Sequence, residues 1–187
     1  MHIIAGERRG AQLFAPKGMD TRPTQAKVKE SLFNIIQAHV PDAHVLDLFS
    51  GSGNLALEAI SRGAASAVMV DMDREAAACI RRNVEKLRFE DCTRFLRCDW
   101  RQAVSQLRNT EKFDLVFLDP PYRMTELDEM CAALADANLL AEDAMLVLEH
   151  KTGACPPLDE RFELFKERVY ADTEIHFYLY TGDEKGA

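Results

Sequence analysis

The stretch VLDLFSGSGNLALEAISRG, residues 45–63, carries the first evidence for the fold. An apolar segment interrupted only by Asp47 leads to glycines at 51 and 53, and then to a helix-like segment that ends at Gly63. Glycine adopts positive φ without strain and lets a ligand approach the backbone closely. A helix that starts directly after a buried strand also offers unpaired N–H groups and a partial positive charge. The stretch therefore predicts a strand, a ligand-binding turn and a helix.

Strand-like and helix-like segments alternate along the chain. Strands are expected at 44–49, 66–70, 93–97, 113–118 and 144–150, and helices at 53–62, 74–87, 100–108 and 125–137. Because these strands are apolar throughout, they are typical of a parallel sheet covered on both faces. FELFKERVY and EIHFYLY follow with no helix between them, and are expected to finish the sheet as an antiparallel pair. The predicted fold class is α/β with a mostly parallel sheet.

The first 40 residues precede this alternation. HIIAG and AQLFA flank a turn and predict a short hairpin, and TRPT opens a helix that Pro41 ends. At 187 residues the chain suits one domain with a sizeable core. We therefore expect a single domain, 1–187, in which 1–40 form a basic hairpin-and-helix appendage on an α/β core of 41–187 that carries the site.

Charge is distributed unevenly along the chain. The net charge of −8 and the pI near 5.2 count against nucleic-acid binding. The first 40 residues, however, hold six Lys or Arg against three acidic residues. Such a basic arm suits a polyanion held by one edge of the protein, with Arg8 and Arg9 among its contacts. An ordinary solvated face explains the same charges equally well.

Cysteine spacing and hydropathy indicate whether the chain binds a metal and in which compartment it is expected. The five cysteines include no C-x-x-C pair, and Cys92 and Cys98 are too far apart for a zinc knuckle. Reduced thiols and no metal site are therefore expected. No apolar run reaches membrane-spanning length, and the first ten residues lack the layout of a signal peptide. We expect a cytoplasmic protein without a membrane partner.

The glycine loop fits two kinds of nucleoside ligand. GSGNLA matches the G-x-G-x-x-G/A fingerprint of dinucleotide sites, with Asp71 at about the right distance for a ribose contact. Asp47 favours the other kind, because a carboxylate there would repel the pyrophosphate of NAD but attract the sulfonium and amino groups of S-adenosylmethionine. S-Adenosylmethionine is therefore the expected cofactor.

Further polar and aromatic residues follow the second and third expected strands. Asp71 can accept hydrogen bonds from both ribose hydroxyls, and Asp99 can accept one from the adenine amino group. Trp100 is available to pack on the adenine ring, although plain core packing explains it equally well. Asp73 is better explained as the N-cap of the next helix than as a ligand contact.

The segment FDLVFLDPPY ends in Asp119-Pro120-Pro121-Tyr122 and predicts the chemistry. Neither proline can donate to a sheet, so the strand ends there, at the edge where ligands bind in open α/β sheets. The Asp119 carboxylate and the Pro120 carbonyl form a rigid acceptor pair for the two N–H donors of an exocyclic amino group, and Tyr122 can stack on the base. The same oxygens would stabilise the positive charge that the nitrogen gains during methyl transfer. These four residues are the predicted catalytic residues.

Four segments together resemble a known family. TRPTQAKVKESLFNII, VLDLFSGSGNLALEAISRGA, DLVFLDPPY and RVYADTEIHFY are similar to the bacterial 16S rRNA guanine-N2 methyltransferases of the RsmD type, and the likeness covers nearly all 187 residues in the same order. It implies the Rossmann-like fold of class I S-adenosylmethionine-dependent methyltransferases. It also implies methylation of the amino group of one guanine, position 966 in the usual rRNA numbering. DPPY alone occurs in many amino-methyltransferases, whereas its combination with TRPT is specific.

Carried over by position, the resemblance implies a role for each residue of the site. The donor-binding residues would be Asp47, Phe49, Gly51 and Gly53 at the methionine end, Asp71 at the ribose and Asp99 at the adenine. The target base would meet residues 119–122. Arg22 and Thr24 lie in a family motif that contacts RNA or the carboxylate of the donor, or that caps the helix. They join Arg8 and Arg9 as candidate substrate-binding residues.

Other functions would use some of the same features. The acceptor pair alone does not distinguish guanine from adenine or cytosine, so an amino-methyltransferase acting on another RNA or on DNA is one alternative. A non-catalytic ribosome-assembly protein would use only the basic region, and a nicotinamide-dependent oxidoreductase would have no use for residues 119–122. Because the basic region is small, the expected partner is 16S rRNA within an assembled small subunit or an assembly intermediate.

Overall fold

The computed structural model describes residues 1–16, 23–121 and 123–182, and only the backbone of residues 23–25. Arg22 and Tyr122 therefore lie outside the described residues, as does the side chain of Thr24. In the described ranges, no helix is long and apolar enough to cross a membrane.

Helices and strands alternate in the expected order. The helices are α1 (Pro23–Ile35), α2 (Asn54–Ser61), α3 (Arg74–Leu87), α4 (Trp100–Leu107) and α5 (Leu127–Asp136), with short 3-10 turns η1 (Gln37–His39) and η2 (Glu90–Cys92). The strands are β1 (His44–Asp47), β2 (Ser66–Val70), β3 (Thr93–Leu96), β4 (Phe113–Leu118), β5 (Leu140–Lys151), β6 (Phe162–Tyr170) and β7 (Thr173–Tyr180).

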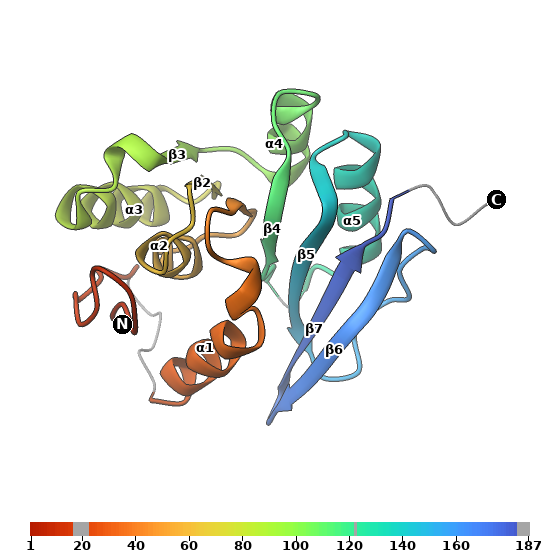
Figure 1. The fold of residues 1–187 in the computed structure, drawn as a ribbon, viewed down its shortest axis with the longest axis horizontal. Coiled ribbons are helices and arrows are strands. Elements are labelled where there is room, and N and C mark those ends of the chain that lie inside the picture. The colour runs from red at the N-terminus through yellow and green to blue at the C-terminus, as the bar shows by residue number, and fades with distance from the viewer. Residues whose placement is uncertain (17–22, 122, 183–187) are drawn as a thin grey trace.

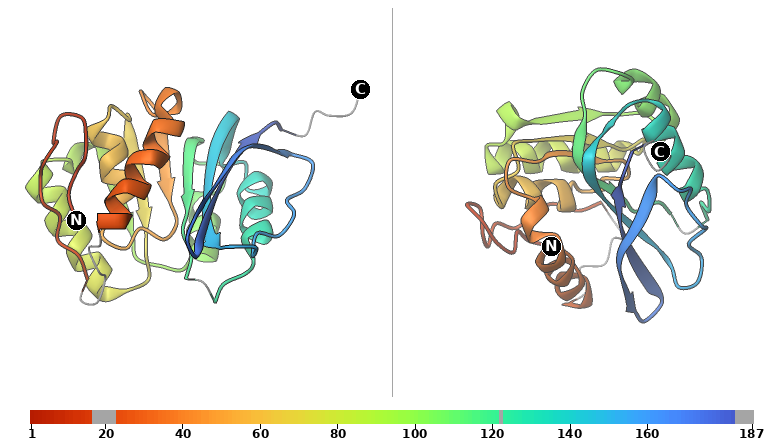
Figure 2. Two further views of the ribbon diagram at one scale, coloured as in Figure 1. Left: turned by 90° about the horizontal axis from the view of Figure 1, so that it is seen from below. Right: turned by 45° about the vertical axis from the view of Figure 1, so that its right-hand side comes forward.

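The seven strands form one sheet in the order β3-β2-β1-β4-β5-β7-β6 (Figure 1). The strands β1 to β5 are parallel, and β7 is antiparallel to both β5 and β6. This arrangement confirms the predicted parallel sheet with an antiparallel C-terminal pair. Figure 2 shows the N-terminal segment and the β6–β7 hairpin on opposite sides of the molecule.

Helices cover both faces of the central strands, which explains why β1, β2 and β4 are largely apolar, whereas the edge strand β6 is mostly exposed. The first three helices bury one face, where Phe33 of α1 packs on Phe117 of β4 with 5.9 Å between the ring centroids. The helices α4 and α5 bury the other face through residues such as Val104 and Leu134. Two apolar layers thus hold the sheet, and the site lies at one edge of it.

Most element boundaries agree with the expected ranges, and the differences have local causes. The helix α3 starts where expected because Asp73 caps it, accepting hydrogen bonds from the N–H groups of Glu75 and Ala76 at 2.7 and 2.9 Å. The strand β5 begins four residues earlier than expected, at Leu140. A register shift lies in this extension, near Asp143 with its φ of +58°. Glu142 and Asp143 in this extension are polar and exposed, as in a loop, so the sequence did not indicate that the strand begins before them.

The N-terminal hairpin is held by the helices more than by its own strands. It has one bridge, between His2 and Gln12, instead of the two expected strands. Gly6, with φ of +82°, lies so close to α2 that a Cβ there would be 1.7 Å from the carbonyl oxygen of Ser61. Ile3 joins the core beneath the first three helices.

Glu58 of α2 is the buried anchor of this N-terminal segment. Its fully buried carboxylate accepts hydrogen bonds from the N–H groups of Ile4 and Ala5 at 2.8 and 3.0 Å. Lys29 of α1 and Arg62 each approach the same carboxylate at 2.8 Å. Burial acts to raise the pKa of Glu58, but the charge of Lys29 and these hydrogen bonds hold it below its usual value. One carboxylate therefore joins α1, α2 and the N-terminal segment.

The substitution Glu58→Gln is expected to lower the free energy of unfolding by about 3–5 kcal/mol, because Lys29 would keep a buried charge without its partner. Urea unfolding followed by circular dichroism measures this loss. Glu85→Gln, on the exposed side of α3, is the matched control and should change stability by less than about 0.5 kcal/mol. Equal losses for the two variants would contradict the anchoring role.

Candidate active site

The carboxyl ends of β1 and β4 lie side by side where the strand order reverses. The strand β1 pairs with β2 on one side and with β4 on the other. Open α/β sheets bind ligands at such a switch point. Asp47 is the last residue of β1, and Asp119 directly follows β4. Two residues predicted from separate segments of the sequence therefore meet at one edge.

Strand register gives three acidic residues a common face at this edge. Asp47 lies opposite Phe117, and β4 and β5 pair in register up to Leu118. Successive residues of a strand alternate between faces, and paired residues of parallel strands share a face. Asp119 is therefore on the same face as Asp47 and also as Glu149 of β5. This is the face that α1 and α2 cover.

Glu149 is the residue that sequence reasoning missed. It is half-buried in β5, and its charge raises the pKa of Asp119. The available signal was a single acid near the end of the apolar segment AMLVLEH. Its significance depends on the neighbour that it meets across the sheet, which only the pairing of β4 with β5 reveals.

Asp47 is buried, with 2% of its surface exposed. Desolvation raises its pKa from 3.8 to about 7, and the charge of Asp71 adds to this, while hydrogen bonds from the backbone of Phe49 and Ala56 act in the opposite direction. The fold thus holds an acid here that ionises near neutral pH, ready to be stabilised by a cation.

Asp119 is accessible to solvent at the end of β4. Its pKa is raised well above the usual value by desolvation, and then by the charges of Glu149 and Asp47. Because solvent reaches the side chain, we attribute the shift chiefly to the neighbouring carboxylates. Burial also raises the pKa of Glu149. Among the described residues, no Lys or Arg forms an ion pair with any of these three acids.

The glycine loop is preformed between β1 and α2. Gly51 and Gly53 adopt φ of +55° and +79°, as a ligand-binding turn requires. A Cβ on Gly53 would lie 3.0 Å from Sδ of Met69 and 3.1 Å from Cδ1 of Leu57, so a side chain there would crowd these neighbours and be strained by the positive φ. The N–H of Gly51 donates to Oδ2 of Asp71 at 2.8 Å.

The other predicted acids hold local structure through their carboxylates. Asp71 also accepts from the N–H of Asp73 at 2.8 Å, through Oδ1. Asp73 caps α3, which confirms the capping interpretation. Asp99 caps α4, with Oδ1 accepting from the N–H of Gln102 at 2.9 Å. A carboxylate oxygen has two lone pairs, so ligand contacts by Asp71 and Asp99 are compatible with these bonds and stay predictions.

The two aromatic residues predicted for the donor site, Trp100 and Phe49, differ in exposure. Trp100 is 5% exposed and lies in the core between the sheet, α4 and α5, as the core-packing alternative expected. Its faces are therefore not available as a stacking platform, and a contact with adenine is limited to the small exposed part of the ring. Phe49 is half-buried beside the glycine loop, and its contact with the donor stays a prediction.

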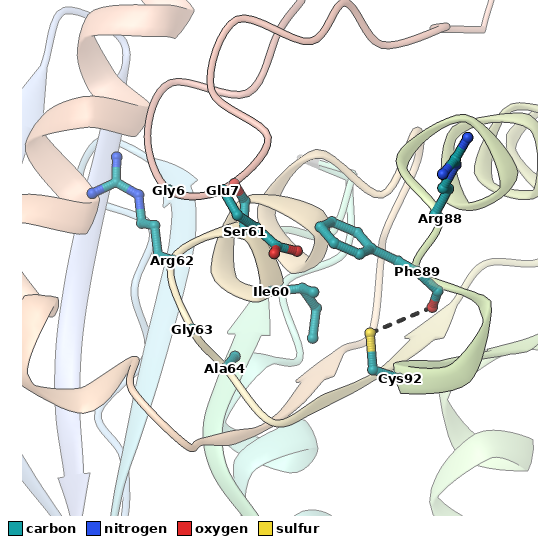
Figure 3. Close-up of a pocket in the computed structure, with 10 residues that line it drawn as sticks. All are labelled: Gly6, Glu7, Ile60, Ser61, Arg62, Gly63, Ala64, Arg88, Phe89 and Cys92. Carbon is teal, nitrogen blue, oxygen red and sulfur yellow. Dashed lines mark hydrogen bonds between the residues drawn. The ribbon is translucent and has the colours of Figure 1, made fainter.

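A hollow of about 570 Å³ lies at the opposite edge of the sheet (Figure 3). Its lining comes from the N-terminal turn, the end of α2 and the segment before β3. Since these segments precede β2 and β3, the hollow is at the amino ends of the strands. It is therefore separate from the three acids.

Arg8 belongs to this opposite edge as well. Its Nε donates to the carbonyl of Leu87 at 2.7 Å, and its guanidinium lies over the ring of Phe89. Arg9 is exposed on the same turn. The structure does not bring either residue to Asp119, so their predicted substrate contacts would involve RNA away from the target base.

Comparison with known proteins identifies the family. The family described as Conserved hypothetical protein 95 matches residues 1–179. Ribosomal RNA small subunit methyltransferase D of Escherichia coli K12 is 32% identical over 187 residues, covering 100% of this chain and 92% of that protein. The chain belongs to the methyltransferase D (RsmD) family. The RsmD relative of Haemophilus influenzae is 29% identical, with coverages of 95% and 93%.

Solved structures agree with this RsmD membership. The structure of yhhF from Escherichia coli has a TM-score of 0.88 and 32% identity, and the match covers 97% of this chain and 98% of that one. PH1948 from Pyrococcus horikoshii, at 16% identity, shares the fold with a TM-score of 0.67. The fold is therefore the Rossmann-like class I methyltransferase fold, and the resemblance inferred from the motifs is confirmed.

The substitution Asp47→Asn is expected to stabilise the protein in a pH-dependent way. Because the folded pKa is raised from 3.8 to about 7, ionising Asp47 costs stability progressively over this range, and the full cost is present above it. The gain in unfolding free energy of the variant over wild type should be roughly 1–3 kcal/mol larger at pH 8 than at pH 5. Urea unfolding at both pH values measures it, with the exposed Asp91→Asn as control. A gain that does not change with pH would refute the assignment.

Proposed function

We propose that the chain transfers a methyl group from S-adenosylmethionine to the exocyclic N2 of a guanine in 16S rRNA. Three findings support this proposal. The chain belongs to the RsmD family, and the carboxyl edge of the sheet carries both a preformed glycine loop and three acids, Asp47, Asp119 and Glu149, without a Lys or Arg partner among the described residues. The observation that carries the proposal is the pair of carboxylates, Asp119 and Glu149, on one face at the ends of adjacent strands.

The donor fits the residues present at the end of β1. S-Adenosylmethionine, when bound, supplies an activated methyl on a sulfonium. Asp47 is a buried acid with no cationic partner among the described residues, and the positive charge of the donor would provide one. The backbone at Gly51 and Gly53 would allow close approach, Asp71 would accept from the ribose hydroxyls, and Asp99 from the adenine. Binding of the cation should lower the pKa of Asp47 and keep it ionised.

We infer the identity of the target base from the hydrogen-bonding groups that residues 119, 120 and 149 would present to it. The carboxylates of Asp119 and Glu149 and the carbonyl of Pro120 all accept hydrogen bonds. Guanine presents N1–H and N2–H₂ side by side, a row of donors only. Adenine and cytosine place a ring nitrogen that accepts next to the amino group, and a carboxylate facing it would repel its lone pair. An edge rich in acceptors therefore favours guanine.

The same acids suit the proton balance of the reaction. As N2 forms its bond to the methyl carbon, the sulfonium bond breaks and the nitrogen becomes positive; it must then lose one proton. The negative charge of Asp119 and Glu149 stabilises the developing cation. Their raised pKa values make either carboxylate a better proton acceptor than an ordinary acid.

An adenine or cytosine amino-methyltransferase is the second candidate. The raised pKa of Glu149 supports it, because a protonated Glu149 could donate to the ring nitrogen of either base. Incubation with labelled donor, followed by nucleoside chromatography of the digested RNA, decides between the candidates. Label in N2-methylguanosine supports the proposal, whereas label in another methylated nucleoside overturns it.

We further propose that the substrate is the assembled small subunit or an assembly intermediate in the cytoplasm. The net charge of −8 supports a folded ribonucleoprotein surface as the target, since the chain has little positive charge for binding naked RNA. Equal rates of methylation on protein-free 16S rRNA and on assembled subunits lacking the modification would contradict this part of the proposal.

Asp119→Asn is expected to slow methyl transfer by about 10²–10³-fold, because the amide cannot provide the negative charge that stabilises the reacting nitrogen. Single-turnover transfer of labelled methyl to small subunits measures the rate. Donor affinity should change by less than about threefold, and the control Asp91→Asn should behave like wild type. A wild-type rate for Asp119→Asn would remove Asp119 from the reaction, whereas no transfer by the wild-type chain would favour a non-catalytic RNA-binding protein.

Glu149→Gln is expected to change which base is accepted. Substrates would carry guanine or 2-aminopurine at the target position; 2-aminopurine keeps the amino group but has an N1 acceptor in place of N1–H. Wild type should prefer guanine by about 10–100-fold, because a carboxylate facing the N1 acceptor leaves both groups unpaired. The Gln amide can donate to N1, so the variant should lose most of this preference. Glu142→Gln, exposed on the same strand, is the control, and an unchanged preference in Glu149→Gln would exclude Glu149 from base recognition.

A further inference from the structure

Three potential metal ligands meet where β5, β7 and the loop between β5 and β6 come together. His150 lies near the end of β5, Cys155 in the loop and His176 in β7. One ligand atom from each residue lies within 4.8 Å of the others. His150 and His176 are only 5% and 9% exposed, and their rings meet edge to face with 4.8 Å between centroids.

The hydrogen bonds of the two imidazoles identify which nitrogen of each ring is left without a partner. Nδ1 of His150 lies 2.9 Å from the carbonyl oxygen of Lys151, and Nε2 of His176 lies 3.1 Å from Oε1 of Glu174. Because these oxygens only accept, both of those nitrogens carry the proton. In the neutral imidazoles, the remaining nitrogens, Nε2 of His150 and Nδ1 of His176, then have free lone pairs. Both are buried and have no hydrogen-bond partner in the described part of the chain.

This pattern is the one that metal-binding histidines show. A ligating imidazole usually donates its other N–H to a carbonyl or carboxylate, which orients the ring and fixes the tautomer. Here His150 has a carbonyl as this partner, and His176 has a carboxylate. Glu174 in turn accepts from the N–H of Gly153 at 2.9 Å, in the loop that carries Cys155. The supporting interactions are therefore present around the three ligands.

We propose that His150, Cys155 and His176 bind a zinc ion. Two imidazoles and a thiolate suit a borderline-soft transition metal, whereas Mg²⁺ and Ca²⁺ prefer oxygen ligands. Tetrahedral zinc would bring the ligand atoms, which lie within 4.8 Å of one another, to separations of about 3.5 Å. The ion would ionise Cys155, and Glu174 would balance the remaining positive charge.

The role of this site is structural. His150 follows Glu149 in β5, so their side chains point to opposite faces of the sheet, and the ion would not touch the target base. It would tie residues 152–161 to the β5–β7 pair, next to the strand end that presents Glu149. The cysteine spacing predicted no metal site because the three ligands come from separate elements and meet only in the fold.

Cobalt substitution in the full-length chain tests the proposal. After metal removal, titration with Co²⁺ should give about one equivalent bound, with a thiolate-to-cobalt charge-transfer band and tetrahedral d–d bands, and Zn²⁺ should displace it and raise Tm by several degrees. Cys155→Ser should lose the charge-transfer band, and His176→Gln the tetrahedral d–d bands. Cys92→Ser, with a half-buried thiol elsewhere, should keep the wild-type spectrum.

A conservative change outside the ligand set separates zinc binding from simple packing. Glu174→Gln should weaken Co²⁺ binding by about 10–100-fold while leaving the spectrum of the saturated protein unchanged. A wild-type chain that binds no stoichiometric Co²⁺ or Zn²⁺ would overturn the proposal and leave a bridging water as the partner of the two imidazoles. A charge-transfer band that persists in Cys155→Ser would overturn it as well.

Discussion

Unpaired negative charge at the carboxyl edge of the sheet is the constraint on which the site depends. Parallel pairing in register gives Asp47, Asp119 and Glu149 one face, and no Lys or Arg among the described residues neutralises them. Keeping such acids together costs stability, which the two apolar layers on either side of the sheet must offset. Under the proposed function, the positive charge of S-adenosylmethionine would relieve this repulsion, and so would the N–H groups on the edge of the guanine. Binding energy would then be available at the reacting atoms themselves.

Acids elsewhere in the chain have different partners and therefore different roles. Asp73 and Asp99 satisfy the first N–H groups of helices, and Asp71 holds the glycine loop. Glu58 is fully buried but fully paired, and it joins the N-terminal segment to α1 and α2. The residue type is the same in all these places. What distinguishes the proposed site is that three carboxylates share one face of the sheet, have raised pKa values and pair with no Lys or Arg among the described residues.

Local signals in the sequence predicted most of the fold. Helix α3 and strand β4 begin and end where expected, since a capping acid starts the helix and two prolines end the strand. The N-terminal hairpin was predicted less well because only a few backbone hydrogen bonds cross it, and others join it to Glu58 and Ser61 of α2. Trp100 could not be assigned to core or cofactor from sequence, because its surroundings are supplied by α5 and the sheet.

The sequence by itself determined the order of the elements, the glycine turn, the acid before it and the Asp-Pro-Pro segment at a strand end. These features depend on residues within a few positions of one another, so the chain specifies them locally. Only the tertiary structure decided that Glu149 stands beside Asp119, and that His150, Cys155 and His176 face one another. Strand pairing brings together residues that are far apart in the chain, and the alternation of side chains along each strand decides which of them share a face.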